Sequence, residues 1–243
     1  MSGVRLLLVL PLLGALLLSG CGGNPVTASS SPTASAASPV PPNDPTQPRS
    51  KLAARAAAAK DLRQVAHYLL KTSGRPDRTV AITRATDGSW RVDVPGGAHG
   101  GAVDIALVFT GGALHQCVLP NQGCVHIDGP LPKTADPKIE HLITDWLGVL
   151  TDRQQALAVS MAQPLEGAAG ECFAIESSAV SLQIPLDVGI YCYERDGTLT
   201  AAKLSFGTMV LAGKPGAAPP SIALPGPVVK GTPLPLAAPP SPS

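Results

Sequence analysis

The sequence predicts an α+β protein built on one large antiparallel sheet, and three observations lead to this fold class. Strand-like apolar stretches fall into two groups that flank a short helical region in mid-chain. The dipeptides Asp87-Gly88 and Asp196-Gly197 lie between neighbouring strand patterns and are typical of turns. Strands and helices do not alternate one by one, as parallel strands joined by helical crossovers would, so antiparallel pairing is expected.

The first group opens with a predicted helix over residues 51–72. Its apolar residues recur at steps of three and four, and Ser73-Gly74 is a stop signal. A glycine-rich loop over residues 96–101 separates two of the strand patterns that follow. The expected strands are residues 79–86, 90–94 and 102–110, followed by a hairpin over 115–127.

The sequence predicts two helices in the middle of the domain. An Asp-Pro pair at 136–137 begins the first, which is expected to run to about Gly148. Residues 151–154 read Thr-Asp-Arg-Gln, a capping box for a second helix with Leu157, Ala158 and Met161 on its apolar face. The closing strands are expected at residues 171–177, 185–194, 198–206 and 208–213.

Both ends of the domain have compositions that do not build a core. Residues 22–50 are rich in Pro, Ser, Ala and Thr, and ten of the thirty residues from 214 to 243 are proline. Such tracts are expected to stay solvated. The sequence therefore predicts a disordered tether after Cys21 through residue 50, one domain over 51–213 and a disordered tail over 214–243.

Residues 1–20 have the features of an export signal. Arg5 precedes an apolar run from Leu6 to Gly20, whose 15 residues are fewer than a membrane-spanning helix needs. The run ends in LSGC at positions 18–21, which resembles the lipobox of bacterial lipoproteins. The resemblance implies cleavage before Cys21 and a diacylglycerol anchor on its sulfur, at the extracytoplasmic face of the cell membrane. A plain cleaved signal and a retained anchor are the alternatives.

The four other cysteines are expected to form two disulfides, because their number is even and the domain is predicted to be exported. In a hairpin whose paired residue numbers sum to 241, Cys117 lies opposite Cys124. Cys172 is then left to pair with Cys192, and both lie in β-rich stretches.

The same hairpin register sets His115 opposite His126. Two His-x-Cys arms that face each other carry the ligand types of a zinc site. An oxidising compartment favours the disulfide instead, so no metal ion is expected.

Charge and motifs exclude several classes of protein. The 18 basic and 17 acidic residues form no basic stripe, and aromatic residues are scarce at 3%, so nucleic acid is not an expected partner. No nucleophile elbow, zinc-protease motif or phosphate-binding loop occurs, so neither catalysis nor a cofactor is expected. His141 and Asp145 share a predicted helix face and would suit a catalytic relay or a metal pair. A surface contact is favoured, since no nucleophile can be placed beside them.

The chain resembles the LolA-like superfamily. The resemblance lies in a lipidated cysteine and tether, a helix before a strand meander, mid-chain helices, and the closing segments ECF at 171–173 and GIYCYERDGTLTAAKLSF at 189–206. It implies a half-barrel of antiparallel strands over residues 51–213, with helices packed on its concave side. The superfamily includes carriers of lipoproteins and glycolipids as well as periplasmic stress sensors.

The expected function is non-catalytic binding of a hydrophobic ligand, either a lipid or the acyl chain of a lipoprotein. The strand over 102–110 is apolar on both faces, so both faces need a cover: the core on one and a helix or ligand on the other. The expected walls of the ligand space are Val92, Val94, Ile105, Leu107, Phe109, Leu142 and Trp146.

Two alternatives stand beside this interpretation. Both faces of the strand could pack against helices and leave no ligand space. The protein could also be an interaction or sensory lipoprotein of the cell envelope, whose proline-rich tail binds a partner in extended form.

Overall fold

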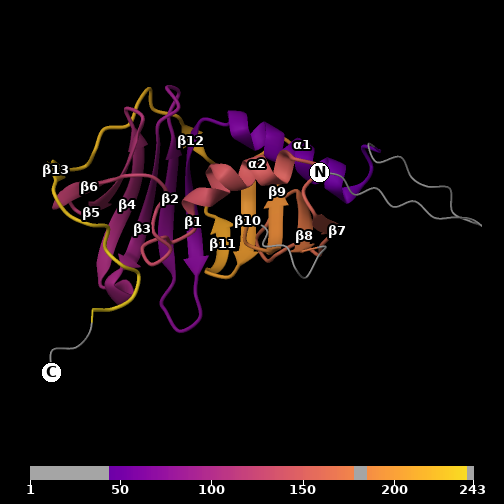
Figure 1. The fold of residues 1–243 in the computed structure, drawn as a ribbon. Helices are drawn as coiled ribbons and strands as arrows, with labels where there is room; N and C mark the ends of the chain where they lie inside the picture. Colours follow the sequence, from indigo (N-terminus) through magenta and orange to yellow (C-terminus); the bar gives the residue numbers. More distant parts are fainter. Residues whose placement is uncertain (1–43, 178–184, 240–243) are drawn as a thin grey trace, which may run out of the picture. The chain divides into compact units, whose positions relative to one another are not determined.

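The structure is a computed structural model that describes residues 44–177 and 185–239 (Figure 1). The signal segment, Cys21 and the tether through residue 43 lie outside the described residues, as do residues 240–243 of the tail. In chain order the elements are α1 (Pro48–Asp61), β1 (Gln64–Lys71), β2 (Arg78–Arg84), β3 (Trp90–Ala98), η1 (His99–Gly101), β4 (Val103–Thr110), β5 (Ala113–Val118), β6 (Gly123–Ile127), η2 (Glu140–Ile143), α2 (Asp145–Thr151), β7 (Leu157–Met161), β8 (Glu171–Ser177), β9 (Gly189–Tyr193), β10 (Leu199–Leu204), β11 (Gly207–Leu211), β12 (Gly216–Ala217) and β13 (Val228–Val229).

All the described strands belong to one open, mostly antiparallel sheet. The strand order is β13-β6-β5-β4-β3-β2-β1-β11-β10-β9-β8-β7, with β12 pairing beside β1. Two meanders, β1–β6 and β7–β11, therefore meet where β1 pairs with β11, in a register that sets Tyr68 opposite Leu211. The predicted α+β class and large antiparallel sheet are confirmed at this level, while the short pair β13–β6 is parallel.

The two Asp-Gly turns form as predicted because aspartate side chains hold them. Ser89 donates its backbone N–H to Asp87 Oδ1 at 2.8 Å, and Thr198 does the same to Asp196 Oδ1 at 2.8 Å. Gly197 has a φ of +90°, and a Cβ there would lie 2.3 Å from the amide nitrogen of Ala59. The second turn can therefore pack on the end of α1 only with glycine at this position.

The predicted helix over 51–72 is correct for its first half only. α1 ends at Asp61, and Leu62 already has extended backbone angles. The guanidinium groups of Arg84 and Arg63 donate hydrogen bonds to carbonyl oxygens of the last helical turn, including that of Lys60. From Gln64 the chain is strand β1, which pairs with β2 on one side and β11 on the other. Two long-range partners outweigh the helical spacing of its leucines.

The predicted mid-chain helices also differ from the structure. The first is broken into η2 and α2, because Thr144 between them has non-helical angles of φ −119° and ψ −115°. The second is wrong: residues 157–161 form strand β7, which pairs with β8. Thr151 closes α2 instead of capping a new helix, since its hydroxyl donates to the carbonyl oxygens of Leu147 and Gly148.

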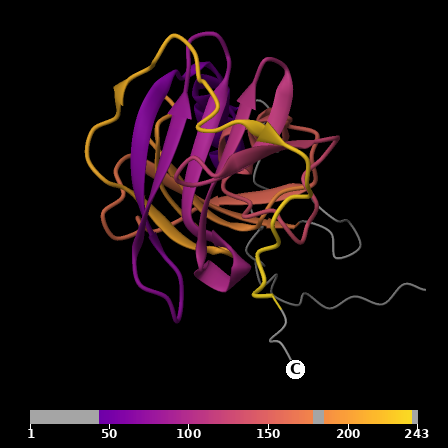
Figure 2. The same ribbon diagram turned by 90° about the vertical axis from the view of Figure 1, so that its left-hand side faces the viewer.

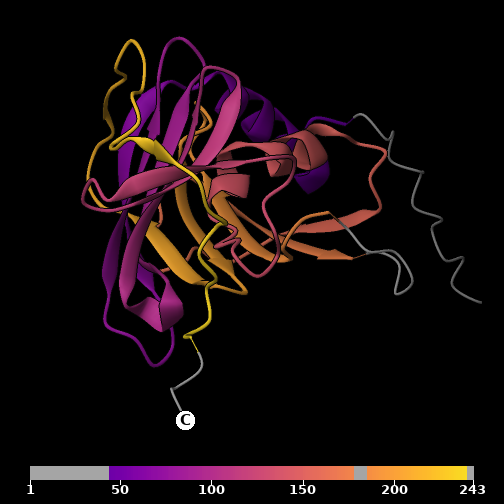
Figure 3. The same ribbon diagram turned by 60° about the vertical axis from the view of Figure 1, so that its left-hand side comes forward.

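The main core lies between the sheet and the two helices. α1 contributes Leu52 and Ala56, and α2 contributes Leu147 and Leu150. Figures 1 and 3 show α1 and α2 side by side, and two ion pairs tie α1 to the sheet. Both ion pairs run to Glu171 on β8, one from Lys51 and one from Arg55, each at 2.8 Å.

The opposite face of β4 is covered by the proline-rich tail. Ala106 and Val108 pack there with the first disulfide, and Ile222 of the tail covers them. Figure 2 shows the tail, in yellow, running across the magenta strands. Both faces of this strand are therefore covered: Ile105 packs in the main core with helical side chains and with Leu234 of the tail, and Ile222 of the tail covers the other face.

The expectation of a disordered tail from residue 214 is wrong over residues 214–239. Four of its proline carbonyls accept hydrogen bonds from backbone N–H groups at the margin of the sheet. The donors are Thr86 to Pro219, Asp87 to Pro220, Cys124 to Pro227 and His99 to Pro235, at 2.8–3.1 Å. Proline has no N–H to donate, but its carbonyl is an ordinary acceptor, so an extended proline-rich segment can still be fixed on a sheet.

Candidate functional site

The residues predicted to wall a ligand space are buried in the main core or at its edge. Val92, Ile105 and Leu107 have no exposed surface, and Val92 pairs with Leu107 across β3 and β4. Leu142 and Trp146 from the mid-chain helical segments join Val92 and Ile105 in one cluster. Packing of Val92, Ile105, Leu142 and Trp146 in one cluster fills the space between sheet and helices at this level.

Three predicted wall residues lie at the margins of this core. Phe109 is partly exposed and stacks on Trp90, with ring centroids 6.0 Å apart. Leu142 also lines a cavity beside α2, together with Tyr68, Ile82 and other residues. At about 30 Å³ this cavity has room for one or two water molecules and not for an acyl chain. Val94 lies on a larger pocket.

That larger pocket, termed the rim pocket, has a volume of about 220 Å³ and opens at one edge of the core. Its walls come from the β1–β2 turn, the end of β3, the segment before η2, the β10–β11 turn and the tail. The apolar lining is Leu70, Val94, Pro137, Ile139, Phe206 and Leu236. The polar and charged lining is Thr72, Arg75, Arg78, Asp136, Lys138 and Ser205, with Gly96 and Gly97 between them.

Arg78 is the most firmly held cation of the rim pocket. Its Nη1 donates to the carbonyl oxygens of Pro95 and Gly96 at 2.9 and 3.2 Å, and its Nη2 donates to Thr72 Oγ1 at 3.2 Å. Its Nε is buried and has no hydrogen-bond partner within the described ranges. Burial, followed by the neighbouring charge of Arg75, lowers the pKa of Arg78. An anion at this position would relieve both the desolvation and the repulsion.

Lys138 contributes a third cation from the opposite wall. Its Nζ donates to Ser205 Oγ at 2.9 Å and lies 3.6 Å from Asp187. Its φ of +65° is unusual for a residue other than glycine, and the backbone N–H of Lys138 is held by Asp136 Oδ1 at 2.6 Å. Sparsely populated backbone conformations of this kind concentrate at functional sites.

The glycine-rich loop forms a wall of the same pocket. A Cβ on Gly97 would lie 2.6 Å from a side-chain carbon of Ile105 and 2.8 Å from the carbonyl oxygen of Val94. Only glycine therefore lets the backbone approach β4 this closely. From the sequence, this loop was given no binding role, because it lacks the features of a phosphate-binding loop.

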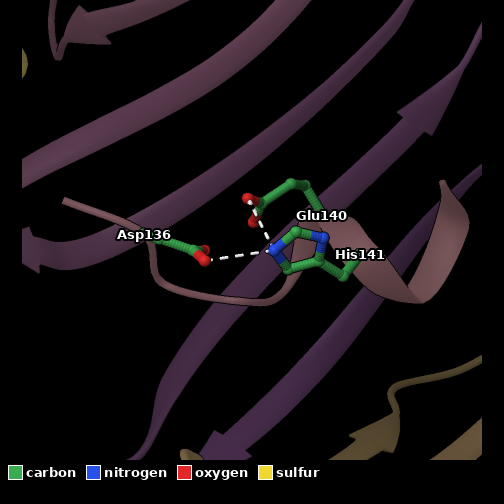
Figure 4. Close-up of side chains that lie close together, drawn as sticks. All are labelled: Asp136, Glu140 and His141. Carbon is green, nitrogen blue, oxygen red and sulfur yellow. Dashed lines mark hydrogen bonds and ion pairs between the residues drawn. The ribbon is translucent and has the colours of Figure 1, made fainter. Parts of the chain in front are cut away.

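Beside the rim pocket, Asp136, Glu140 and His141 form a close polar cluster, termed the acid–histidine cluster. Figure 4 shows both carboxylates pointing toward the imidazole. His141 Nε2 lies 3.1 Å from Asp136 Oδ2 and 3.8 Å from Glu140 Oε1, and His141 Nδ1 lies 2.6 Å from Asp145 Oδ1. The imidazole stacks on Trp146 with ring centroids 5.1 Å apart. The predicted His141–Asp145 contact is thus present, and it belongs to a larger group.

Burial and mutual charge perturb the titration of this cluster. Burial, reinforced by the nearby Asp136 carboxylate, raises the pKa of Glu140. Burial opposes protonation of His141, but hydrogen bonds to Asp136 and Asp145 outweigh it and raise the pKa of His141 to about 9. Burial by itself would raise the pKa of Asp136, but the hydrogen bonds that Asp136 accepts from His141 and from the Lys138 backbone outweigh burial and lower the pKa.

The cysteines lie at bonding distance in the two predicted pairs. The Sγ–Sγ distance is 2.09 Å for Cys117–Cys124 and 2.02 Å for Cys172–Cys192. The hairpin has the predicted register, with His115 opposite His126 and ring centroids 5.3 Å apart. Because the sulfur atoms of this hairpin are bonded to each other, they are not free to serve with the histidines as thiolate ligands of a zinc ion.

Sequence reasoning missed most of the rim pocket. Arg75 lies in the β1–β2 turn and Arg78 begins β2, just beyond the end of the predicted helix, and Phe206 was assigned only to a strand end. Leu236 belongs to the tail that was expected to be solvated. A usable signal was the presence of two arginines within the short stretch SGRPDR at 73–78, directly after an apolar run.

Comparison with models of known protein families gives no match for this chain, and comparison with curated proteins gives none either. Among the described residues, no helix combines the length and the apolar character that crossing a membrane requires.

Proposed function

We propose that this protein is an extracytoplasmic lipoprotein, anchored to the cell membrane through diacylglycerol on Cys21, that binds a hydrophobic ligand without catalysis. The domain is proposed to be a LolA-like half-barrel with helices on its concave side. The observation that supports ligand binding most directly is the rim pocket, whose lining combines apolar side chains with three cationic ones.

The pocket suits an amphiphile with an anionic head. An apolar chain in contact with Leu70, Val94 and Phe206 would gain about 0.8 kcal/mol for each methylene removed from water. A carboxylate or phosphate head would meet Arg75 and Arg78, which already repel each other. Lipids and acylated molecules carry this combination of groups, and an anchor on Cys21 would keep the pocket near a membrane that contains them.

The proposal is tested by isothermal titration of the full-length chain in a neutral detergent. Hexyl phosphate and hexyltrimethylammonium have the same alkyl chain and opposite head charges. We expect hexyl phosphate to bind at one site and hexyltrimethylammonium not to bind. Equal binding of the two probes, or no binding of either, would overturn the proposal.

A matched pair of variants locates the binding. Arg75→Gln with Lys138→Gln removes two cations that would each contribute up to about 1 kcal/mol to binding of the phosphate head, so hexyl phosphate affinity should fall about tenfold. Lys203→Gln with Lys214→Gln removes the same charge from exposed positions and should leave the affinity unchanged. Equal losses in both double variants would mean that binding follows net charge and not this pocket.

A role in contacts with another envelope protein is a second candidate, supported by one observation. β7 ends the strand order of the sheet, and Met161 at its end is 46% exposed. An edge strand presents unpaired backbone groups to which a partner strand can add. Photo-crosslinking from position 158 of β7 in intact cells would yield one discrete protein adduct if this candidate is correct and no discrete adduct if it is not.

A further inference from the structure

We propose that Asp136, Glu140 and His141 bind a divalent transition-metal ion, for which Zn²⁺ has the most suitable ligand preference. Zinc in proteins takes imidazole nitrogen and carboxylate oxygen at about 2.0–2.2 Å. The three residues offer one nitrogen and two carboxylates, whose ligand atoms all lie within 4.8 Å of one another. This inference rests on a different set of contacts from the amphiphile proposal and does not depend on it.

The spacing of the ligand atoms fits one shared ion. Tetrahedral ligands at about 2.1 Å from a central ion are separated from one another by about 3.4 Å. The distances from His141 Nε2 are 3.1 Å to Asp136 Oδ2 and 3.8 Å to Glu140 Oε1, which lie on either side of this value. Small side-chain adjustments would therefore bring all three atoms to an ion between them.

Glu140 supplies an independent indication that this cluster binds a cation. Its side chain is only 6% exposed, and its Oε2 has no hydrogen-bond partner in the part of the chain that the structure describes. A buried carboxylate oxygen that accepts no hydrogen bond, in a group beside a second carboxylate, is costly. A divalent ion would neutralise both carboxylates and give the buried oxygen atoms of Glu140 a ligand role.

The imidazole is already oriented as a metal ligand. Asp145 holds His141 Nδ1 at 2.6 Å, and Thr144 Oγ1 donates to the same carboxylate at 3.0 Å. Metal-binding histidines usually bond their second nitrogen to a carboxylate in this way, which directs the first nitrogen at the ion. The break between η2 and α2 at Thr144 lies directly before Asp145.

Three protein ligands leave one tetrahedral position open. Asp136 also lines the rim pocket, so a fourth ligand could approach from that side. The nearest cation on this segment, Lys138, has its ammonium turned to Ser205 and Asp187. The open position would accept water or an anionic oxygen.

The test is titration of metal-free, full-length chain without a histidine tag, in neutral detergent. We expect one Zn²⁺ per chain by calorimetry and, with Co²⁺, the visible absorption of a tetrahedral site. Glu140→Gln keeps the side-chain shape and should weaken Zn²⁺ binding at least 100-fold, and His141→Gln should do the same. Asp145→Asn should weaken it about 10- to 100-fold.

Glu176→Gln, at an exposed position on β8, is the matched control and should bind as the unmodified chain does. Zn²⁺ should also raise the Tm of the unmodified chain and leave that of Glu140→Gln unchanged, which tests the site independently of a possible folding defect. No stoichiometric Zn²⁺ binding would mean that the cluster is an ion-pair network only. Binding that persists in both Glu140→Gln and His141→Gln would place the metal elsewhere and overturn the proposal.

Discussion

The packing of the proline-rich tail can be tested at Gln116. This side chain is 2% exposed and lies on β5. Its Oε1 accepts the backbone N–H of Leu234 at 2.6 Å, and its Nε2 donates to the carbonyl oxygen of Leu234 at 3.2 Å. Gln116→Leu keeps a similar volume and removes both hydrogen bonds, so it should loosen the end of the tail without removing a core side chain.

The expected magnitude follows from these two bonds. Each contributes about 1 kcal/mol net, so the free energy that holds this part of the tail on the sheet should fall by about 2 kcal/mol. Because 1.4 kcal/mol corresponds to a factor of ten, the open population should rise about 30-fold. Leu236 lines the rim pocket, so the same opening would remove one of its walls.

Hydrogen exchange measured by mass spectrometry reads this opening directly. The amides of His99 and Gly100 donate to the tail carbonyls of Pro235 and Leu236, and their exchange should accelerate about 30-fold in Gln116→Leu. Amides paired with the upstream tail, such as Thr86, should change much less. Gln122→Leu, at an exposed turn position, is the control. Unchanged exchange at positions 99 and 100 in Gln116→Leu would refute the proposed attachment.

Two further predictions concern the covalent framework. Replacing both Cys172 and Cys192 by Ala should lower the free energy of unfolding by about 3 kcal/mol, and replacing both Cys117 and Cys124 by Ala should lower it by about 2.5 kcal/mol. The first loss is larger because that disulfide closes a loop with a sequence separation of 20, against 7 for the second. Chemical denaturation measures both losses, and the reverse order would contradict the loop-entropy reasoning. Cys21→Ala should release the chain from the membrane fraction, and unchanged membrane retention would disprove lipid anchoring through this residue.

Local signals account for the parts of the fold that the sequence predicted well. The hairpin around Cys117 and Cys124 is fixed by a short turn and by the pairing of cysteines seven residues apart. The turns at Asp87 and Asp196 are held by hydrogen bonds to residues two positions away. Interactions of this short range can be predicted from a few neighbouring residues. The turn signals therefore placed strands correctly before and after each turn.

Long-range pairing explains the errors. Residues 64–71 carry helical spacing, but their partners in β11 lie about 140 residues further along the chain. Tail residues accept hydrogen bonds from positions more than 100 residues away, as Pro219 does from Thr86. Composition could not predict this packing, because the carbonyl groups that hold the tail are present in every residue type.

The candidate site was predictable only in part for the same reason. His141 and Asp145 are four residues apart, so a helical spacing revealed their contact. The rim pocket brings together five separate segments, including the tail, and its cations carry no shared sequence motif. The predicted wall residues were chosen as apolar strand and helix positions, and this criterion selects the filled core more readily than a pocket at its edge.

The central claim is that the rim pocket holds an anionic amphiphile, and native mass spectrometry of the full-length chain purified from membranes tests it most directly. Ser205→Trp would place an indole ring at the pocket, while Ser160→Trp adds the same ring at an exposed position on β7. We predict a non-covalent amphiphile adduct on the unmodified chain and on Ser160→Trp, released on denaturation, and no adduct on Ser205→Trp. The same adduct on all three chains, or none on any, would contradict the claim.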